Sequence, residues 1–153
     1  MTALRLMTAA GDDRKATAID QNHLGRMTLG DRRLEREVLE LFLRQTTIML
    51  NRIVNADPPL AAAAAHTLKG SARGIGAWRV ARAAEFLEHA AGGDSGEDAS
   101  EHAGGHAGGH AGGHAAGHDL ADAIAELKAA SLEVSAAIGV RLTVLWAELG
   151  RQG

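Results

Sequence analysis

The most informative part of the sequence is the stretch Ala65-His66-Thr67-Leu68-Lys69-Gly70-Ser71. Five alanines, residues 61–65, come directly before His66. Alanine is the strongest helix former, so this histidine is predicted to lie inside a helix. A glycine four residues after the histidine costs that helix about 1 kcal/mol relative to alanine. We infer that the missing Cβ at Gly70 gives a large molecule access to the imidazole of His66.

Helix geometry places Lys69, Gly70 and Arg73 on the same face as His66, because residues three, four and seven apart share one side of a helix. Leu68 falls on another side, so His66 is predicted to face outward. An imidazole with an unperturbed pKa of about 6.5 is a good nucleophile near neutral pH. Lysine neutralises phosphoryl oxygens as a point charge, and arginine does so with a planar fork or pairs with acidic residues of a partner.

The composition indicates an all-α protein. The chain has 153 residues, which is enough for one domain with a core, and only two prolines. No period-two strand pattern occurs, and aromatic residues make up 3%, so aliphatic side chains and alanine must fill the core. A net charge of −3 argues against nucleic-acid binding. Because cysteine is absent, disulfides and thiolate metal sites are excluded.

The sequence also predicts where the protein resides. No uninterrupted apolar run approaches the roughly 20 residues that cross a bilayer, so no membrane association is expected. The apolar residues among the first ten are interrupted by Arg5 and form too short a run for a secretory signal. We therefore expect a cytoplasmic, monomeric protein.

Capping residues, prolines and glycines along the chain predict one short helix and three long ones. The short helix covers 19–27, and the long helices run from Asp31 to Asn55, from Pro58 to about Ala90 over roughly 50 Å, and from a cap at Asp119 to about Leu149. A bend is expected after Gly74 and Gly76, where the apolar stripe changes phase. The economical assembly is an antiparallel four-helix bundle with a short extra N-terminal helix and a long Gly/His-rich loop before the last helix.

The predicted helices and the glycine content also give the domain boundaries. Residues 1–18 are expected to form a flexible tail, residues 19–149 the bundle, and residues 150–153 a C-terminal tail. An insertion over residues 92–118 interrupts the bundle, and its glycine content predicts disorder.

Apolar positions at helical spacing give the expected core. In the first long helix they are Leu34, Val38, Leu41, Phe42, Ile48, Leu50 and Ile53, and the solvated face carries Arg32, Arg33, Glu35, Arg36 and Glu40. The second contributes Leu68, Ile75, Val80, Ala83 and Leu87. The last contributes Leu120, Ile124, Leu127, Val134, Ile138, Leu142, Leu145 and Leu149, read as core rather than as a coiled-coil dimer seam. Trp78 and Trp146 are expected in the core or at its rim, and His23 and His89 at the surface.

Histidines recur at every fourth residue of the insertion. Neutral imidazole binds zinc, nickel or copper, so His102, His106, His110, His114 and His118 are weak metal-ligand candidates. The two glycines in each repeat weaken a helix that would align these rings, and an expansion without a selected role is the simpler explanation of the repeat.

The stretch from His66 to Ser71, continued by Ile75-Gly76-Ala77 and Leu87-Glu88, resembles the signature of the histidine-containing phosphotransfer (HPt) domain. This family carries phosphoryl groups in multi-step two-component phosphorelays. Thr28-Leu29-Gly30-Asp31 and residues 39–45 resemble its opening helices, so the likeness covers roughly residues 19–91. The long insertion and the additional Gly74 depart from the family pattern.

The resemblance implies that His66 accepts the phosphoryl group, that Lys69 stabilises it and that Gly70 makes room for it and for the partner. Arg73, Gln45 and Ser71 are possible auxiliary residues, with Gln45 reaching toward His66 and Ser71 packing closely. The implied partners are response-regulator receiver domains, with a hybrid histidine kinase as a further possibility. No cofactor is implied in this chain, since the magnesium ion belongs to the receiver.

The implied role is that of a covalent phosphoryl carrier rather than an enzyme. No glycine-rich phosphate loop followed by lysine and serine or threonine is present, so autophosphorylation from ATP is not expected. Two alternatives stay open: a metal-binding helical protein that uses the histidine-rich loop, and an adaptor that binds a receiver without exchanging phosphate.

Overall fold

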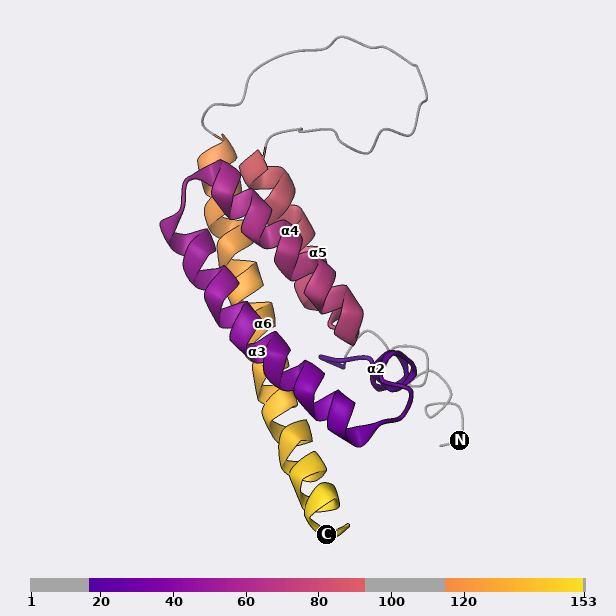
Figure 1. Cartoon of the computed structure of the whole chain (residues 1–153). Helices are drawn as coiled ribbons and strands as arrows, with labels where there is room; N and C mark the ends of the chain where they lie inside the picture. Colours follow the sequence, from indigo (N-terminus) through magenta and orange to yellow (C-terminus); the bar gives the residue numbers. More distant parts are fainter. Residues whose placement is uncertain (1–16, 93–114, 153) are drawn as a thin grey trace, which may run out of the picture.

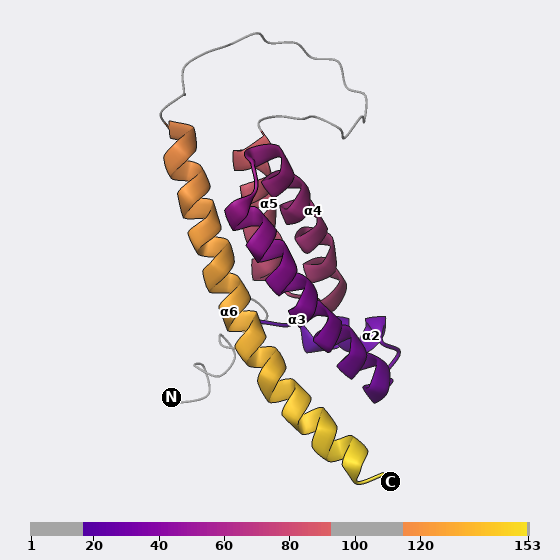
Figure 2. The same cartoon turned by 60° about the vertical axis from the view of Figure 1, so that its left-hand side comes forward.

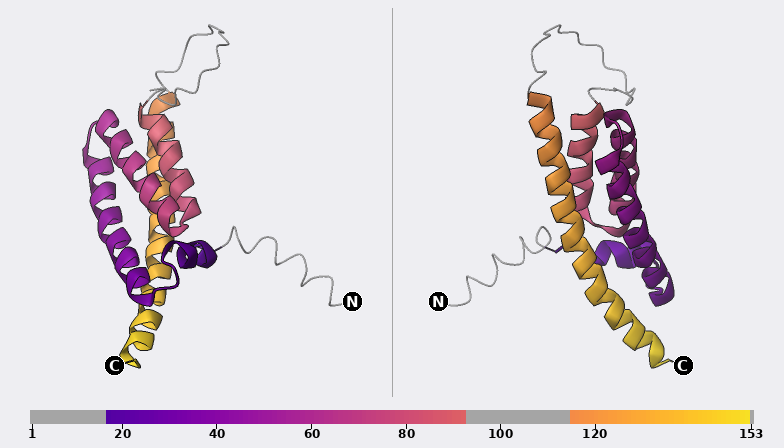
Figure 3. Two further views of the ribbon diagram at one scale, coloured as in Figure 1. Left: turned by 45° about the vertical axis from the view of Figure 1, so that its right-hand side comes forward. Right: turned by 90° about the vertical axis from the view of Figure 1, so that its left-hand side faces the viewer.

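The computed structural model describes residues 17–92 and 115–152, and in this part of the chain helices are joined by short turns without any β-strand (Figure 1). The helices are α2 (Gln21–Met27), α3 (Arg32–Asn55), α4 (Pro58–Ile75), α5 (Trp78–Gly92) and α6 (Ala115–Gly150). Both α3 and α5 pack against α4 and α6, as the views of Figures 2 and 3 show. The prediction of an all-α protein is therefore confirmed.

The helix predicted over residues 58–90 is wrong, because the structure breaks it into α4 and α5. Gly76 ends α4 in the left-handed conformation, with φ of 76°. Its N–H donates to the carbonyl of Arg73 at 3.3 Å, and the N–H of Ala77 donates to the carbonyl of Ala72 at 2.9 Å. These bonds satisfy carbonyls at the end of α4, and glycine adopts this conformation without a Cβ clash. The expected bend is thus a reversal of the chain.

The short helix α2 is fastened to this turn by Asp20. The Asp20 carboxylate caps α2 by accepting from the N–H of His23 at 3.0 Å and also accepts from Nε1 of Trp78 at 3.3 Å. The backbone N–H of Asp20 donates to the carbonyl of Gly76 at 2.9 Å. The His23 ring lies edge-on against Trp78 with centroids 5.0 Å apart, so His23 is half-buried and not the surface residue that was predicted. His89 is exposed, as predicted.

The predicted core face of α3 is wrong in part. Phe42 and Ile53 are buried as expected and Val38 and Leu50 pack against the core, but Leu34, Leu41 and Ile48 are 40%, 49% and 49% exposed. The remaining buried positions are taken by Glu35, Leu39, Thr46 and Met49. Two apolar stripes at helical spacing lie on neighbouring sides of this helix, and spacing alone does not say which of them faces the other helices.

Glu35 also differs from its predicted place on the solvated face. It is 3% exposed, and its carboxylate accepts from Nε of Arg141 at 2.6 Å and from Arg32 at 3.1 Å. An ion pair therefore joins α3 to α6 inside the interface. Burial of a carboxylate requires such partners, since an unpaired buried charge is very costly.

The expected core positions of α4 and α5 are all buried: Leu68, Ile75, Val80, Ala83 and Leu87. Those of α6 are buried or half-buried. This last helix begins at Ala115, so Asp119 lies within it and does not cap it. Trp78 is half-buried, whereas Trp146 is 58% exposed with the Arg36 guanidinium 4.5 Å from its ring centre.

Part of α6, Asp119–Gly150, is long and apolar enough to cross a membrane by length and composition, with a mean hydropathy of 1.3. One such helix is weak evidence for a span, because helices of soluble bundles pass the same test.

Most of the predicted tail and most of the histidine-rich insertion lie outside the described residues, including His102, His106, His110 and His114. Gly92 belongs to α5, and the backbone of His118 to α6.

Candidate functional site

His66 projects from the middle of α4 into solvent. Its neighbours Ala65 and Leu68 are fully buried, and this fixes the rotation of α4 about its axis. The side chain of His66 is 67% exposed as a result. The outward orientation expected from helix geometry is therefore present.

Glu88 of α5 holds both His66 and Lys69. One carboxylate oxygen, Oε1, lies 2.7 Å from Nδ1 of His66, and the other, Oε2, accepts from Nζ of Lys69 at 2.7 Å. The two helices run in opposite directions from the turn at Gly76, so a residue near the C-terminal end of α5 lies level with the middle of α4 (Figure 1). The single carboxylate thus fixes the histidine ring and the lysine relative to each other.

These contacts keep Glu88 ionised. Burial raises the pKa of Glu88, but the hydrogen bonds from Lys69 and His66, with the positive charge of Lys69, outweigh burial and hold the pKa below its ordinary value. An ionised carboxylate accepts hydrogen bonds and cannot donate them. Nδ1 of His66 must therefore carry the hydrogen in this contact, which assigns the proton from the bonding pattern.

The charges around His66 are balanced within the α4–α5 surface. Lys69, whose side chain is only 14% exposed, is neutralised by Glu88. Arg73 pairs with Glu85 at 3.2 Å, with both side chains about half exposed. The Arg73 side chain is therefore paired with α5 and does not contact His66. Such an exposed ion pair adds little to the stability of the fold.

Open space surrounds the α4 glycines. A Cβ added at Gly70 or at Gly74 would meet no atom within 4 Å, apart from the helix's own backbone. Packing within the described chain therefore does not explain either glycine. The hydroxyl group of Ser71 donates to the carbonyl of Thr67 at 3.2 Å, so Ser71 bonds within its own helix. Gln45 is half-buried on α3 and makes no side-chain hydrogen bond among the described residues, His66 included.

The structure brings together His66, Lys69 and Glu88, and the sequence reasoning missed the role of Glu88. Glu88 was part of the quoted signature, but only the chain reversal at Gly76 places it beside His66. A helix continuing through residue 90 would have placed the two residues more than 30 Å apart. The signal that was available was the pair of glycines at 74 and 76, interpreted as a bend.

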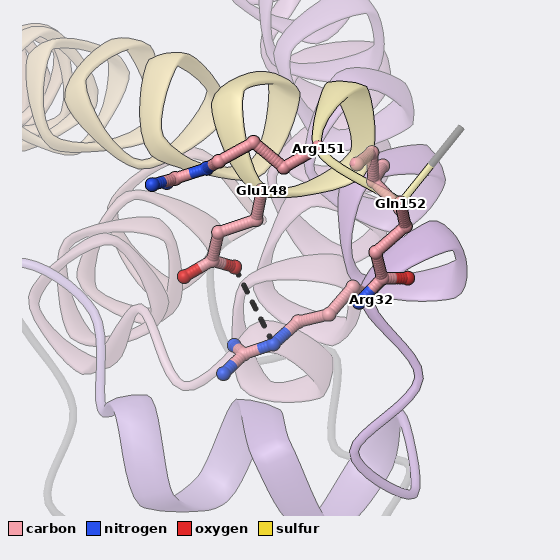
Figure 4. Close-up of a pocket in the computed structure, with 5 residues that line it drawn as sticks. Arg32, Glu148, Arg151 and Gln152 are labelled. Carbon is pink, nitrogen blue, oxygen red and sulfur yellow. Dashed lines mark ion pairs between the residues drawn. The ribbon is translucent and has the colours of Figure 1, made fainter.

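Open hollows lie at the far end of the molecule. A cavity of about 400 Å³ is lined by Arg32, Glu148, Leu149, Arg151 and Gln152, where α3 begins and α6 ends (Figure 4). Nε of Arg32 lies 3.6 Å from Glu148 across it. His66 lines neither this cavity nor the neighbouring one around Arg33 and Arg36. The candidate site is therefore an exposed surface, which suits a macromolecular partner better than an enclosed small molecule.

Among residues 17–92 and 115–152, no group of three or more histidine, aspartate or glutamate side chains is arranged to hold a metal ion. Within these residues, neither the ring of His66 nor the carboxylate of Glu88 has a third histidine, aspartate or glutamate side chain beside it. The chemistry available at this surface in the described part of the chain is that of an oriented imidazole beside an ammonium group.

Comparison with protein families matches residues 37–130 to the Hpt domain. The matched range begins in α3, contains all of α4 and α5 with His66, Lys69 and Glu88, and ends within α6. The comparisons with curated proteins and with solved structures gave no significant match. Since the family model covers more than half of the sequence, the chain belongs to the Hpt domain family, whose members are phosphocarrier modules of two-component signalling.

Proposed function

We propose that this protein is a phosphorelay carrier that accepts a phosphoryl group on His66 from a receiver-domain aspartate and passes it to a second receiver. The single observation that carries this proposal is the Glu88 bridge, which orients an exposed imidazole and places an ammonium group beside it. Ordinary surface histidines are not held in this way. We further propose that the four long helices form the antiparallel four-helix bundle typical of the family and that the protein works in the cytoplasm.

Nε2 of His66 is the proposed phosphoryl acceptor. Because Nδ1–H donates to the ionised Glu88, the neutral ring presents the lone pair of Nε2 to solvent. Glu88 also stabilises the positive charge that the ring acquires as Nε2 attacks. In this role Glu88 is a positioning residue, because it touches the imidazole and not the phosphorus.

The proposed transfer is an in-line displacement at phosphorus. The bond from Nε2 to phosphorus forms while the bond from phosphorus to the aspartyl oxygen breaks, and the aspartate leaves as a carboxylate. Such transfers need mainly positioning and neutralisation of charge on the phosphoryl oxygens. Lys69 supplies a positive charge one helical turn from His66, and the receiver supplies the divalent metal ion. The reverse sequence loads the aspartate of the next receiver.

An exposed apolar strip on α3 supports a receiver as the docking partner. Leu34, Leu41 and Ile48 follow one another at intervals of seven and are 40–49% exposed. They lie on the side of α3 opposite Arg36, which contacts Trp146 of α6, and therefore on the side toward α4. A receiver that covers this strip and the open space at Gly70 would bring its phosphoaspartate to His66.

Transfer from a phosphorylated receiver tests the proposal. Label should move to this protein, be stable to base and labile to acid, and be absent in the His66→Gln variant. The matched control is His89→Gln, which removes an exposed histidine of α5 and should leave transfer unchanged. Label that persists without His66 contradicts the proposal. Receiver binding without any label would instead favour a non-transferring adaptor.

Two further outcomes separate this function from its alternatives. We expect no label from ATP when the protein is incubated alone, because no phosphate-binding loop is present in the sequence. A metal-binding protein that uses the histidine-rich segment would neither bind a receiver nor accept its label. Calorimetry with zinc or nickel, with and without residues 99–118, tests that alternative directly.

A further inference from the structure

From Leu132 onward the outer face of α6 is largely apolar and uncovered, and Lys128 is the exposed charge one turn before it. Helices of soluble proteins normally carry polar residues on the side away from the core. Here that side carries Leu132 at 72% exposure and Val140 at 69%, with Val144 at 42% on its flank. Residues 134–147 contain a single charge, Arg141, and it turns inward to Glu35. The most apolar window of α6 is only 28% buried.

The length of α6 adds to the exposure of Val140 and Val144, which lie beyond the stretch that runs beside α5. Near the beginning of α5, Arg79 pairs with Glu126 and Glu133 of α6. The rest of α6 continues beyond that end of α5, with the C-terminal turns projecting past the other helices (Figures 1 and 2). The part of α6 beyond Glu133 therefore packs on α3 and has less of α5 beside it. An exposed apolar surface of this kind marks an interaction site.

The charges at the two ends of the face are opposite in sign. Asp122 lies near the beginning and Arg151 just after the end, and both are exposed. Neither makes an ion pair within the described residues. Positions seven residues apart lie on nearly the same side of a helix, and this side of α6 contains residues 122, 129, 136 and 143. Residue 151, eight positions later, lies close to the same side. A face with acid at one end and base at the other is complementary to itself when turned end for end.

We propose that a second copy of this chain covers the outer face of α6, with the two helices antiparallel. The midpoint between residues 122 and 151 falls next to Ala136, which places the two-fold axis there. In this register Leu132 packs against Val140 of the second copy, and Asp122 of each copy pairs with Arg151 of the other. The interface is isologous and closes as a dimer.

The ion pairs within the bundle favour a second copy over a bilayer. A membrane would take the apolar residues but would leave Asp122, Glu133 and Arg141 without an aqueous or paired environment if α6 left the bundle. The face is one helix wide, so we expect a dissociation constant in the micromolar range rather than the nanomolar range. This proposal replaces the monomer expected from the sequence.

The proposed dimer leaves the phosphotransfer surface free. His66 lies on α4, and α4 packs mainly against α3 and α5 rather than against α6. Both copies would therefore present His66 to receivers at the same time. The proposal does not depend on phosphotransfer, and its test uses association alone.

Sedimentation velocity of the full chain over a range of concentrations tests the association. The wild type should shift from monomer to dimer by about 100 μM, as a micromolar dissociation constant requires. Val140→Glu, which buries a charge in the interface, should remain monomeric. The control Leu60→Glu changes a side chain of similar exposure, 64%, on α4 and should dimerise like the wild type. A wild type that stays monomeric, or a Val140→Glu variant that still dimerises, overturns the proposal.

The orientation is tested by charge exchange and by cross-linking. Asp122→Arg and Arg151→Asp should each weaken the dimer several-fold, and the double variant should restore it. Because the chain contains no cysteine, Ala136→Cys introduces a single thiol at the axis and should form an intermolecular disulfide. Ala147→Cys should not, since in the antiparallel register its two copies are far apart. Cross-linking at 147 instead of 136, or co-sedimentation of monomers with vesicles of phosphatidylcholine and phosphatidylglycerol, overturns the antiparallel dimer.

Discussion

Glu88 follows His66 by 22 positions in the chain, yet Oε1 of Glu88 lies 2.7 Å from Nδ1 of His66. The contact joins two helices and determines which ring nitrogen faces solvent. The order of the helices around the turn at Gly76, rather than local sequence, creates this relationship.

Removing the carboxylate should change the tautomer of the ring. In Glu88→Ala we expect the neutral imidazole to populate the form with hydrogen on Nε2, and phosphoryl transfer to slow by about 10- to 100-fold because the nucleophile is misaligned. Nitrogen NMR of the imidazole reports the tautomer, and rapid quench measures transfer. Glu88→Gln keeps an oxygen acceptor and should retain more activity than Glu88→Ala. An unchanged tautomer in Glu88→Ala would contradict the positioning role.

Gly70→Ala should stabilise the protein while slowing transfer. A Cβ at this position meets open space, so the substitution should raise the free energy of unfolding by about 0.5–1 kcal/mol through helix propensity. The same Cβ would obstruct a docked receiver, and transfer should fall. Gly74→Ala, one turn farther from His66, is the control and should stabilise similarly with a smaller effect on transfer. Urea denaturation and transfer kinetics separate the two effects.

The bridge at Glu88 should stabilise the fold in a pH-dependent way. The pKa of Glu88 lies below its ordinary value of 4.5. Its contribution is therefore complete above the unfolded-state value and is lost as the pH falls through the lower, folded-state value. In a His66→Gln background, the difference in unfolding free energy between Glu88 and Glu88→Gln should be constant well above pH 4.5 and shrink as the pH falls below 4.5. A difference that grows on acidification would reverse the expected sign.

Glu35→Ala should be among the more destabilising single changes. It leaves the partly buried Arg141 without its 2.6 Å partner and should cost about 2–3 kcal/mol, less than for a fully buried pair because Arg141 retains 21% exposure. Glu40→Ala, which removes a looser pair with Arg36, should cost less than about 0.5 kcal/mol. Replacing both Glu35 and Arg141 with leucine should recover most of the loss. Equal costs for Glu35→Ala and Glu40→Ala would refute the importance of burial.

Gly76→Ala should disrupt the α4–α5 turn and release α2. An added Cβ would lie 2.9 Å from Cβ of Asp20, at a φ of 76° that side chains rarely adopt. We expect a loss of about 2 kcal/mol or more, measured by thermal unfolding. Gly30 has a similar φ of 72° but open space around it, so Gly30→Ala isolates the backbone strain and should cost about 1 kcal/mol. If the two variants unfold alike, the close approach of Asp20 contributes nothing.

Sequence predicted the helical class, the outward orientation of His66 and most of the core of α4, α5 and α6, because each follows from local spacing. Three positions of α3 were mispredicted as core because Leu34, Leu41 and Ile48 form a second stripe at the same period. Glu35 was assigned to solvent because nothing near it in sequence reveals Arg141, which lies 106 residues away. Glu88 was missed for the same reason. Contacts between distant residues depend on how the helices are connected, and helical periodicity does not encode that.

Because the chain reverses at Gly76, the number of residues between this turn and Glu88 determines whether the carboxylate faces His66. One residue added between the turn and Glu88 would rotate every later position of α5 by about 100° around its axis. The carboxylate would then point away from the imidazole even though every side chain of the motif from 66 to 71 was intact. A homologue could thus preserve the whole local signature and still lose activity through a single insertion ten residues downstream.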